Sequence, residues 1–156
     1  LDRVSLSHEL DTSKLYLDIE EVRFGERLRL QFDIADDVQN ALVPTMLLQP
    51  IIENSIKHGI SKVEAGGTIA IHAHREGDRL VITVSDDGPG LSGDDAPDQA
   101  LLLSNGVGVS NIRNRLQEIY GDTHKLEFLR TDPHGLTVKV VIPYESEWYA
   151  GQDPGQ

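Results

Sequence analysis

Two adjacent aspartates and two glycines, Asp86-Asp87-Gly88-Pro89-Gly90, follow a run of residues typical of a β-strand. The run at residues 79–84 alternates and is rich in β-branched side chains, which predicts a half-buried strand. The Asp86 carboxylate can accept a hydrogen bond from the exocyclic amine of a purine, and Gly88 and Gly90 allow backbone to approach a flat ring. A tight turn after a strand has the same composition, so this motif alone indicates either a purine pocket or a plain turn.

A second set of polar side chains lies on a helix predicted over residues 44–59. Apolar and small residues recur there every 3.6 residues, which predicts one buried face and one solvated face. Asn54, Lys57 and His58 are three and four residues apart and share the polar face. They suit a metal-bound polyphosphate, with Asn54 as an oxygen ligand to Mg²⁺ and Lys57 as a charge on phosphate. An ordinary solvated face with a Glu53–Lys57 ion pair is the alternative.

A third motif opens a helix predicted to end at Gly121. Gly106 and Gly108 at its start leave free N–H groups at the positive end of the helix dipole, which is a ready anion site. Arg113 adds positive charge there, whereas Arg115 is expected at the surface. The chain contains no Gly-x-x-x-x-Gly-Lys-Ser/Thr motif, which excludes a P-loop.

In this order the three motifs resemble the Bergerat-type ATPases, the family of gyrase, Hsp90-type chaperones, mismatch-repair proteins and histidine kinases. Residues 48–59 resemble the N box of sensor histidine kinases of the LytS/YehU type, and residues 106–116 resemble that group's second glycine box. Residues 16–28 resemble the segment that those kinases carry before the ATP-binding domain. The resemblance spans residues 4–143.

The resemblance implies ATP and Mg²⁺ as cofactors, with Asn54 coordinating Mg²⁺, Asp86 holding the adenine amino group and Lys57 touching phosphate. Thr137 matches a position under the adenine, and a plain strand residue is the alternative interpretation. The other residues expected to bind the nucleotide or shape its pocket and lid are His58, Gly88, Gly90, Gly106, Val107, Gly108, Val109 and Arg113.

Two departures from the family pattern bear on catalysis. Gyrase-like members place a carboxylate four residues before the metal-binding Asn, and Pro50 stands there instead, so robust ATP hydrolysis is not expected. Glu53 is the candidate for assisting phosphoryl transfer, with structural pairing to Lys57 as the alternative. The Pro-His-Phe-Leu-Phe-Asn segment that carries the acceptor in LytS-type kinases is absent. We therefore expect an excised domain whose acceptor lies elsewhere in the parent chain.

The main hypothesis is thus the ATP-binding catalytic domain of a two-component histidine kinase, transferring the γ-phosphoryl group to a histidine on a dimerisation region absent from this fragment. A response regulator, of the LytTR type, is the implied downstream partner, and the implied location is cytoplasmic with the parent kinase in the inner membrane. A non-catalytic nucleotide-sensing module is the alternative, and a serine kinase acting on an anti-sigma antagonist is a third. The net charge of −12 argues against nucleic acid or an anionic membrane as a direct partner.

The expected architecture is an α/β protein, a two-layer α+β sandwich of the Bergerat type. One mixed, mostly antiparallel sheet would carry helices on one face and an ATP lid. Residues 1–25 are expected to form a connecting helix, 26–144 the ATP-binding domain and 145–156 a disordered tail. The elements expected are helices at 5–23, 44–59 (with Pro44 in the first turn) and 109–120, strands at 27–34, 68–74, 80–85, 126–131 and 136–142, and a lid at 91–105.

Overall fold

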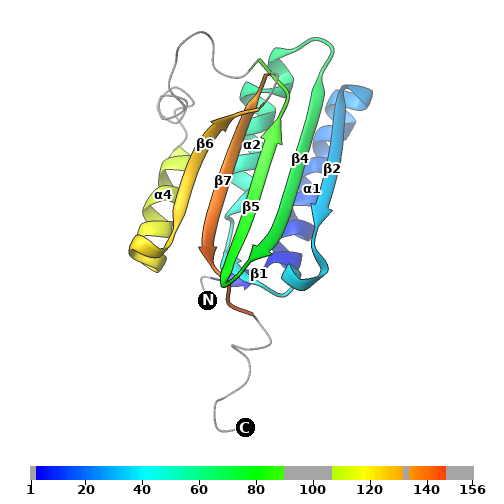
Figure 1. Ribbon diagram of the computed structural model, residues 1–156. Helices are drawn as coiled ribbons and strands as arrows, with labels where there is room; N and C mark the ends of the chain where they lie inside the picture. The colour runs from blue at the N-terminus through cyan, green and yellow to red at the C-terminus, as the bar shows by residue number, and fades with distance from the viewer. Residues whose placement is uncertain (1–2, 90–106, 132–133, 147–156) are drawn as a thin grey trace, which may run out of the picture.

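The computed structural model describes residues 3–89, 107–131 and 134–146, with backbone alone for 107–110 (Figure 1). Five strands form its main sheet, in the order β2-β4-β5-β7-β6. Strand β2 (Leu28–Ile34) pairs parallel with β4 (Gly67–Glu76). The other neighbours pair antiparallel: β4 with β5 (Arg79–Asp86), β5 with β7 (Leu136–Pro143), and β7 with β6 (Lys125–Arg130). The prediction of a mixed, mostly antiparallel sheet is confirmed.

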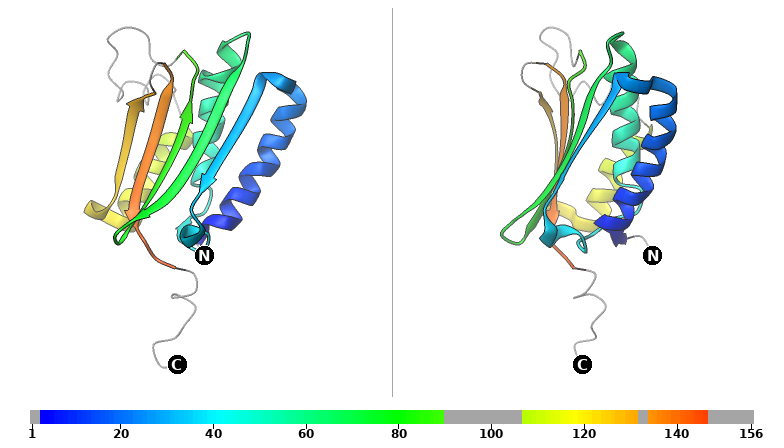
Figure 2. Two further views of the ribbon diagram at one scale, coloured as in Figure 1. Left: turned by 45° about the vertical axis from the view of Figure 1, so that its right-hand side comes forward. Right: turned by 90° about the vertical axis from the view of Figure 1, so that its right-hand side faces the viewer.

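Three helices lie on one face of this sheet: α1 (Leu6–Phe24), α2 (Leu48–His58) and α4 (Val107–Tyr120) (Figure 2). Helix α2 lies between the other two, and the core fills the space between the helices and the sheet. Short 3₁₀ helices at Gly25–Arg27, Asp36–Val38, Ile60–Lys62 and Gly121–Thr123 join the elements. The largest fully buried side chains are Leu6, Leu17, Leu47, Leu48, Ile51, Ile52, Ile60, Ile69, Ile71, Leu80, Ile82 and Ile112.

Strand β4 is apolar toward the helices and polar on the open face of the sheet. In β4, Ile69, Ile71 and Ala73 are buried, whereas His72 and His74 between them are exposed. This alternation is what a sheet covered on one side requires. The two histidines were predicted to lie at the surface, and this is confirmed. Each lies near a carboxylate: His72 Nδ1 is 3.5 Å from Asp33 and His74 Nε2 is 2.7 Å from Glu76.

A second, two-stranded sheet was not predicted. Strand β1 (Arg3–Ser5) pairs antiparallel with β3 (Leu42–Pro44). Three residues on each side are too few to show an alternating pattern. The placement of Pro44 in the first turn of a helix is wrong, because Pro44 ends β3 and α2 begins four residues later. The fixed φ of proline suits either position, so composition could not separate the two.

Several predictions fall at or beyond the limits of the described residues. The expected lid at 91–105 lies outside them, as does 147–156 of the expected tail. At the start of that tail, the Glu145 carbonyl accepts a hydrogen bond from Leu42 N at 2.7 Å, and Ser146 bridges to Ala41. Helix α1 contributes Leu6 and Leu17 to the same core as the sheet. The division at residue 25 stays a prediction.

A buried carboxylate from α1 caps the start of α2. Glu9 is 2% exposed, and its two oxygens accept hydrogen bonds from Met46 N at 3.2 Å and from Leu48 N at 3.1 Å. Met46 has φ of 63°, a backbone conformation uncommon for a non-glycine residue. The carboxylate therefore satisfies the Leu48 N–H, which the first turn of the helix leaves open, and the Met46 N–H just before the helix. It also places negative charge at the positive end of the helix.

Replacing Glu9 with Gln is expected to destabilise the fold. An amide offers one acceptor oxygen for the two N–H groups and turns an N–H₂ group toward one of them, so we expect the free energy of unfolding to fall by about 1–3 kcal/mol. Urea unfolding followed by circular dichroism measures the change. Glu21→Gln, an exposed position on the same helix, is the control. Equal midpoints for the two variants would contradict the capping role.

Candidate functional site

Asp86 is the last residue of β5 and is 4% exposed. Its Oδ1 accepts a hydrogen bond from Gly88 N at 3.0 Å. The backbone N–H of Leu136, at the start of β7, and the hydroxyl of Ser55, on α2, also donate to this carboxylate. A strand end, a turn, a neighbouring strand and a helix therefore hold one side chain in a single orientation.

Burial raises the pKa of Asp86 above its usual value of 3.8, and the negative charge of Asp87 raises it further. The donors at Gly88, Leu136 and Ser55 act in the opposite direction, because they stabilise the ionised form. The net direction is upward. Asp86 is thus a buried carboxylate that is costly to ionise, unlike an ordinary turn residue on the surface.

Three glycines bring backbone against Asp86. A Cβ on Gly59, the residue after α2, would lie 2.8 Å from Asp86 Oδ1, and a Cβ on Gly88 would lie 2.5 Å from the Cα of Gly59. Gly135 has φ of +123°, and a Cβ there would collide with the Asp86 carbonyl oxygen. Side chains are excluded at all three positions, as a pocket that brings backbone close to a flat ligand requires.

Sequence reasoning named Gly88 as a site residue but missed Gly59 and Gly135. Gly59 ends the N-box motif, where it resembles an ordinary helix stop. Gly135 is the last residue of the run Pro133-His134-Gly135, just before a strand, and this run has the composition of a plain turn. The fold brings them together across the chain. His134 adds a further tie, since its Nδ1 lies 2.8 Å from the Gly88 carbonyl oxygen.

Asp87 has a different partner from Asp86. Its Oδ1 accepts a hydrogen bond from Thr68 N at 2.7 Å, and a Cβ on Gly67 would collide with the same oxygen. Asp87 therefore fixes the turn after β5 to the beginning of β4. The two adjacent aspartates therefore have different roles: Asp86 lines the candidate pocket, and Asp87 fixes the turn beside it.

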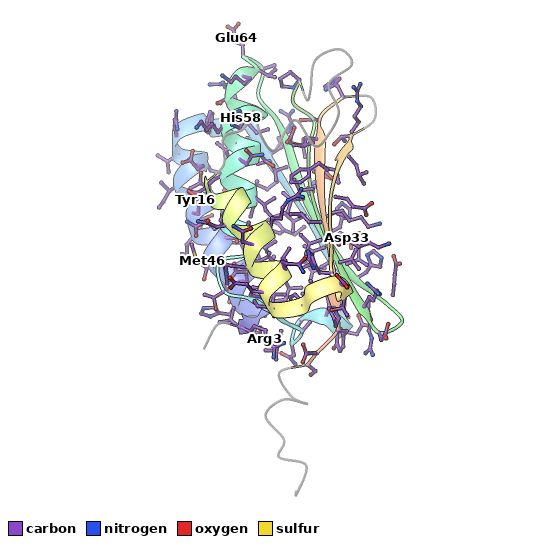
Figure 3. All side chains as sticks on the ribbon, turned by 90° about the vertical axis from the view of Figure 1, so that its left-hand side faces the viewer. Arg3, Tyr16, Asp33, Met46, His58 and Glu64 are labelled. Atoms are coloured by element: carbon purple, nitrogen blue, oxygen red, sulfur yellow. The ribbon has the colours of Figure 1, made fainter. Side chains whose placement is uncertain are left out.

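On α2, Asn54 is only 9% exposed, although it was predicted on the solvated face. The correction follows from the packing, because α2 has the sheet on one side and another helix on each flank. Within the described part of the chain, the Asn54 amide makes no hydrogen bond. His58 is half-buried at the end of the same helix (Figure 3). Asn54, His58 and Asp86 thus lie toward the same end of the molecule.

Glu53 and Lys57 lie on the α1 side of α2. Both line a cavity of about 300 Å³ between the two helices, together with Tyr16 and Glu20. Burial, with the charges of Glu20 and Glu53, raises the pKa of Tyr16 to about 12. Both side chains are exposed, as on an ordinary solvated face, but no ion pair joins Glu53 to Lys57 in the described ranges.

Helix α4 begins at the end of the molecule where β5 ends, as Figure 1 shows. Val107, Gly108 and Val109 form its first turn, while Gly90 and Gly106 lie outside the described residues. Further along the helix, Arg113 is exposed. The helix N-terminus therefore faces the same end of the molecule as Asp86.

Thr137 pairs with Ser85 across β5 and β7, which puts its side chain on the sheet face opposite to Asp86. Its hydroxyl is 2.8 Å from Ser85 Oγ and 2.9 Å from Thr131 Oγ1. Its placement under an adenine stays a prediction.

None of the helices in the described ranges carries an apolar run long enough to span a bilayer.

Comparison with known proteins agrees with this geometry. Residues 39–146 match the family described as histidine kinase-, DNA gyrase B-, and HSP90-like ATPase. The sensor histidine kinase YesM of Bacillus subtilis is 32% identical over 149 residues, which cover 94% of this chain and 25% of YesM. The sensor protein LytS of Staphylococcus epidermidis is 30% identical over 148 residues, covering 92% of this chain and 25% of LytS. The chain thus spans about a quarter of the length of these relatives.

The fold matches that of the catalytic domain of the histidine kinase ThkA in a nucleotide-free form. The TM-score is 0.70 at 14% identity, covering 90% of this chain and 93% of that structure. A structure of ThkA in complex with the response regulator protein TrrA is also similar, with a TM-score of 0.66 at 14% identity, covering 92% of this chain and 41% of that one. The chain is therefore similar to the ATP-binding catalytic domain of sensor histidine kinases. It belongs to the family of histidine kinase-, DNA gyrase B- and HSP90-like ATPases.

Proposed function

We propose that this domain binds Mg-ATP with its adenine on Asp86 and transfers the γ-phosphoryl group to a histidine supplied by another segment. The observation that carries the proposal is the buried Asp86 carboxylate enclosed by backbone at Gly59, Gly88 and Gly135. An ionised carboxylate accepts from the amino group of adenine, whereas the carbonyl oxygen of guanine would find no donor there. The site therefore favours adenine over guanine.

The phosphates would extend from the adenine toward α2 and the start of α4. Mg²⁺ prefers oxygen ligands and usually keeps several waters beside one or two protein ligands and the substrate phosphates, so the single amide oxygen of Asn54 fits it. When bound, the ion neutralises charge on the polyphosphate. The N–H groups in the first turn of α4 add positive potential. Lys57 and Arg113 are proposed as further phosphate contacts, and His58 lies beside Asn54 on the helix.

In the proposed transfer, the bond between the γ-phosphorus and the β–γ bridging oxygen breaks as a histidine nitrogen bonds to phosphorus. ADP leaves, and the imidazole proton passes to a base near the acceptor. The domain's task is positioning and charge neutralisation. Pro50 offers no base for activating water, which favours transfer over hydrolysis. Glu53 stays the candidate for assisting the transfer, from the α1 side of α2.

The proposed partners follow from the same activity. The acceptor would lie on a dimerisation region of the longer protein, and a response regulator would receive the phosphoryl group, as the ThkA–TrrA complex suggests by analogy. The likeness to LytS supports a regulator of the LytTR type. A cytoplasmic location follows from the need for ATP.

Phosphotransfer in trans tests the function. The domain, γ-labelled ATP and Mg²⁺ are incubated with a helical segment carrying the candidate acceptor histidine, and with the same segment carrying Ala in its place. We expect label on the histidine-bearing segment alone, stable in base and lost in acid. Nucleotide binding without any transfer would instead establish the alternative, a nucleotide-sensing module.

Asp86→Asn is expected to lower affinity for a non-hydrolysable ATP analogue about 10- to 100-fold. The amide loses charge and presents an N–H₂ group, which cannot accept from the adenine amine. Isothermal titration with and without Mg²⁺ measures the loss, which should be similar in both conditions because Asp86 acts on the base. Asp78→Asn, in the exposed β4–β5 turn, is the matched control. Similar affinities for both variants would refute the pocket assignment.

Nucleotide affinity is also expected to depend on pH through Asp86. Its pKa is raised by burial, and the adenine amine requires the ionised form. Nucleotide affinity should therefore be highest at neutral pH. It should fall as the pH is lowered through the pKa of Asp86, which lies above 3.8. The ratio of wild-type affinity to Asp86→Asn affinity should fall toward one over the same pH range. Only the wild-type protein loses affinity there, because the variant lacks the titrating carboxyl group. A constant ratio from neutral pH to about pH 4 would exclude this role.

A further inference from the structure

Helix α1 is apolar on two opposite faces. Leu6, Leu10 and Leu17 are at most 4% exposed and pack into the core. On the far side of the helix lies an apolar stripe, formed by Leu15, Ile19 and Val22. These three side chains are 67%, 69% and 88% exposed. Figure 2 shows α1 at the margin of the helix layer.

An exposed isoleucine, leucine or valine standing alone needs no explanation, but the stripe is regular. Its members are four and three residues apart, which puts them within one narrow band along the helix. This is the spacing of the d, a and d positions of a heptad, the pattern by which two helices form a coiled-coil seam. The core-facing leucines occupy the positions opposite to the seam, so the fold leaves the stripe open.

The charges beside the stripe favour a copy of the same helix as its occupant. With Ile19 at position a, Asp18 falls at g and Arg23 at e of the following heptad turn. In a parallel two-stranded coil, g of one helix meets e of the other five residues further on, so Asp18 would meet Arg23 of the second copy, twice by symmetry. In an antiparallel pair, position g faces g, and Asp18 would meet acidic Asp18 or Asp11 instead.

We propose that the apolar stripe is a self-association surface, through which two copies of this chain pair in parallel along α1. The Arg23 side chain is 69% exposed, and its described contacts are a 3.7 Å ion pair with Glu20 and the Phe24 ring, whose centroid is 5.0 Å from the guanidinium carbon. Both contacts lie within α1, so the exposed guanidinium can also reach across the seam. The domains would lie on opposite outer sides of the pair, because each core is on the face away from the seam. The proposal does not depend on nucleotide binding.

The pairing is expected to be weak. Three apolar layers bury far less than a standard interface, so dimers should form only at high protein concentration or where the two helices are held together. Sedimentation velocity from micromolar to about millimolar protein measures this. We expect a concentration-dependent dimer that Ile19→Asp abolishes, while its far-ultraviolet circular dichroism stays that of the folded protein. A wild-type protein that is monomeric throughout would overturn the proposal.

Disulfide trapping tests the geometry, because the chain has no cysteine of its own. Ile19→Cys and Val22→Cys should each cross-link to their own copies under mild oxidation. Glu21→Cys, exposed on the same helix but off the seam, is the control and should cross-link far more slowly. In an antiparallel pair position a faces position d, so Leu15→Cys would instead link to Ile19→Cys in a mixture and Val22→Cys alone would stay unlinked. That result, or equal rates at positions 19 and 21, would refute parallel pairing.

A charge exchange tests the partner. Asp18→Arg and Arg23→Asp should each weaken dimerisation about two- to fivefold, because each puts like charges opposite one another. The double exchange should restore the wild-type dissociation constant. Restoration requires that residue 18 of one copy meets residue 23 of the other. Additive losses in the double variant would show that the stripe does not pair with a second copy in this register.

Discussion

The arrangement depends on one buried carboxylate that is held in place before any ligand arrives. Asp86 receives donors from Gly88, Leu136 and Ser55, which belong to a turn, a strand and a helix. Its burial makes the charge costly, so the donors are needed to orient it and to moderate that cost. A carboxylate fixed in this way can select a ligand by one hydrogen bond, because it does not need to reorganise on binding.

The surrounding packing explains why so few side chains are needed at this site. Glycine backbone lies against Asp86 at positions 59, 88 and 135, and Asp87 secures the same turn to β4. Helix α2 lies over the sheet with Ser55 directed at the carboxylate and Asn54 beside it in sequence. The buried face of α2 thus carries both core and site. A change in the packing of this helix would therefore disturb Asn54 and the contact of Ser55 with Asp86 together.

Sequence reasoning was strongest where a local pattern reports the environment. Period-two and period-3.6 patterns predicted the main strands and helices, because a one-sided sheet imposes them. Sequence reasoning failed where residues far apart in the sequence determine the environment of a side chain. Asn54 was predicted to be solvated, since its own helix cannot reveal neighbours on both flanks. The Glu9 cap on α2 joins residues nearly forty positions apart, and Gly59 meets Gly88 only in the folded chain. No local signal encodes such contacts.

The parallel pairing of β2 with β4 also bears on how the protein folds. A parallel pair cannot be closed by a tight turn, and the connection here runs from residue 35 to 66 and contains α2. The helix that carries Asn54 and Ser55 is therefore part of the crossover segment. The edge strand β2 can pair with β4 only after the whole connection has been brought into place. Closing so long a connection costs chain entropy, which places this pairing among the later steps of folding. A chain that emerges in order from the ribosome would hold β2 unpaired until β4 is made.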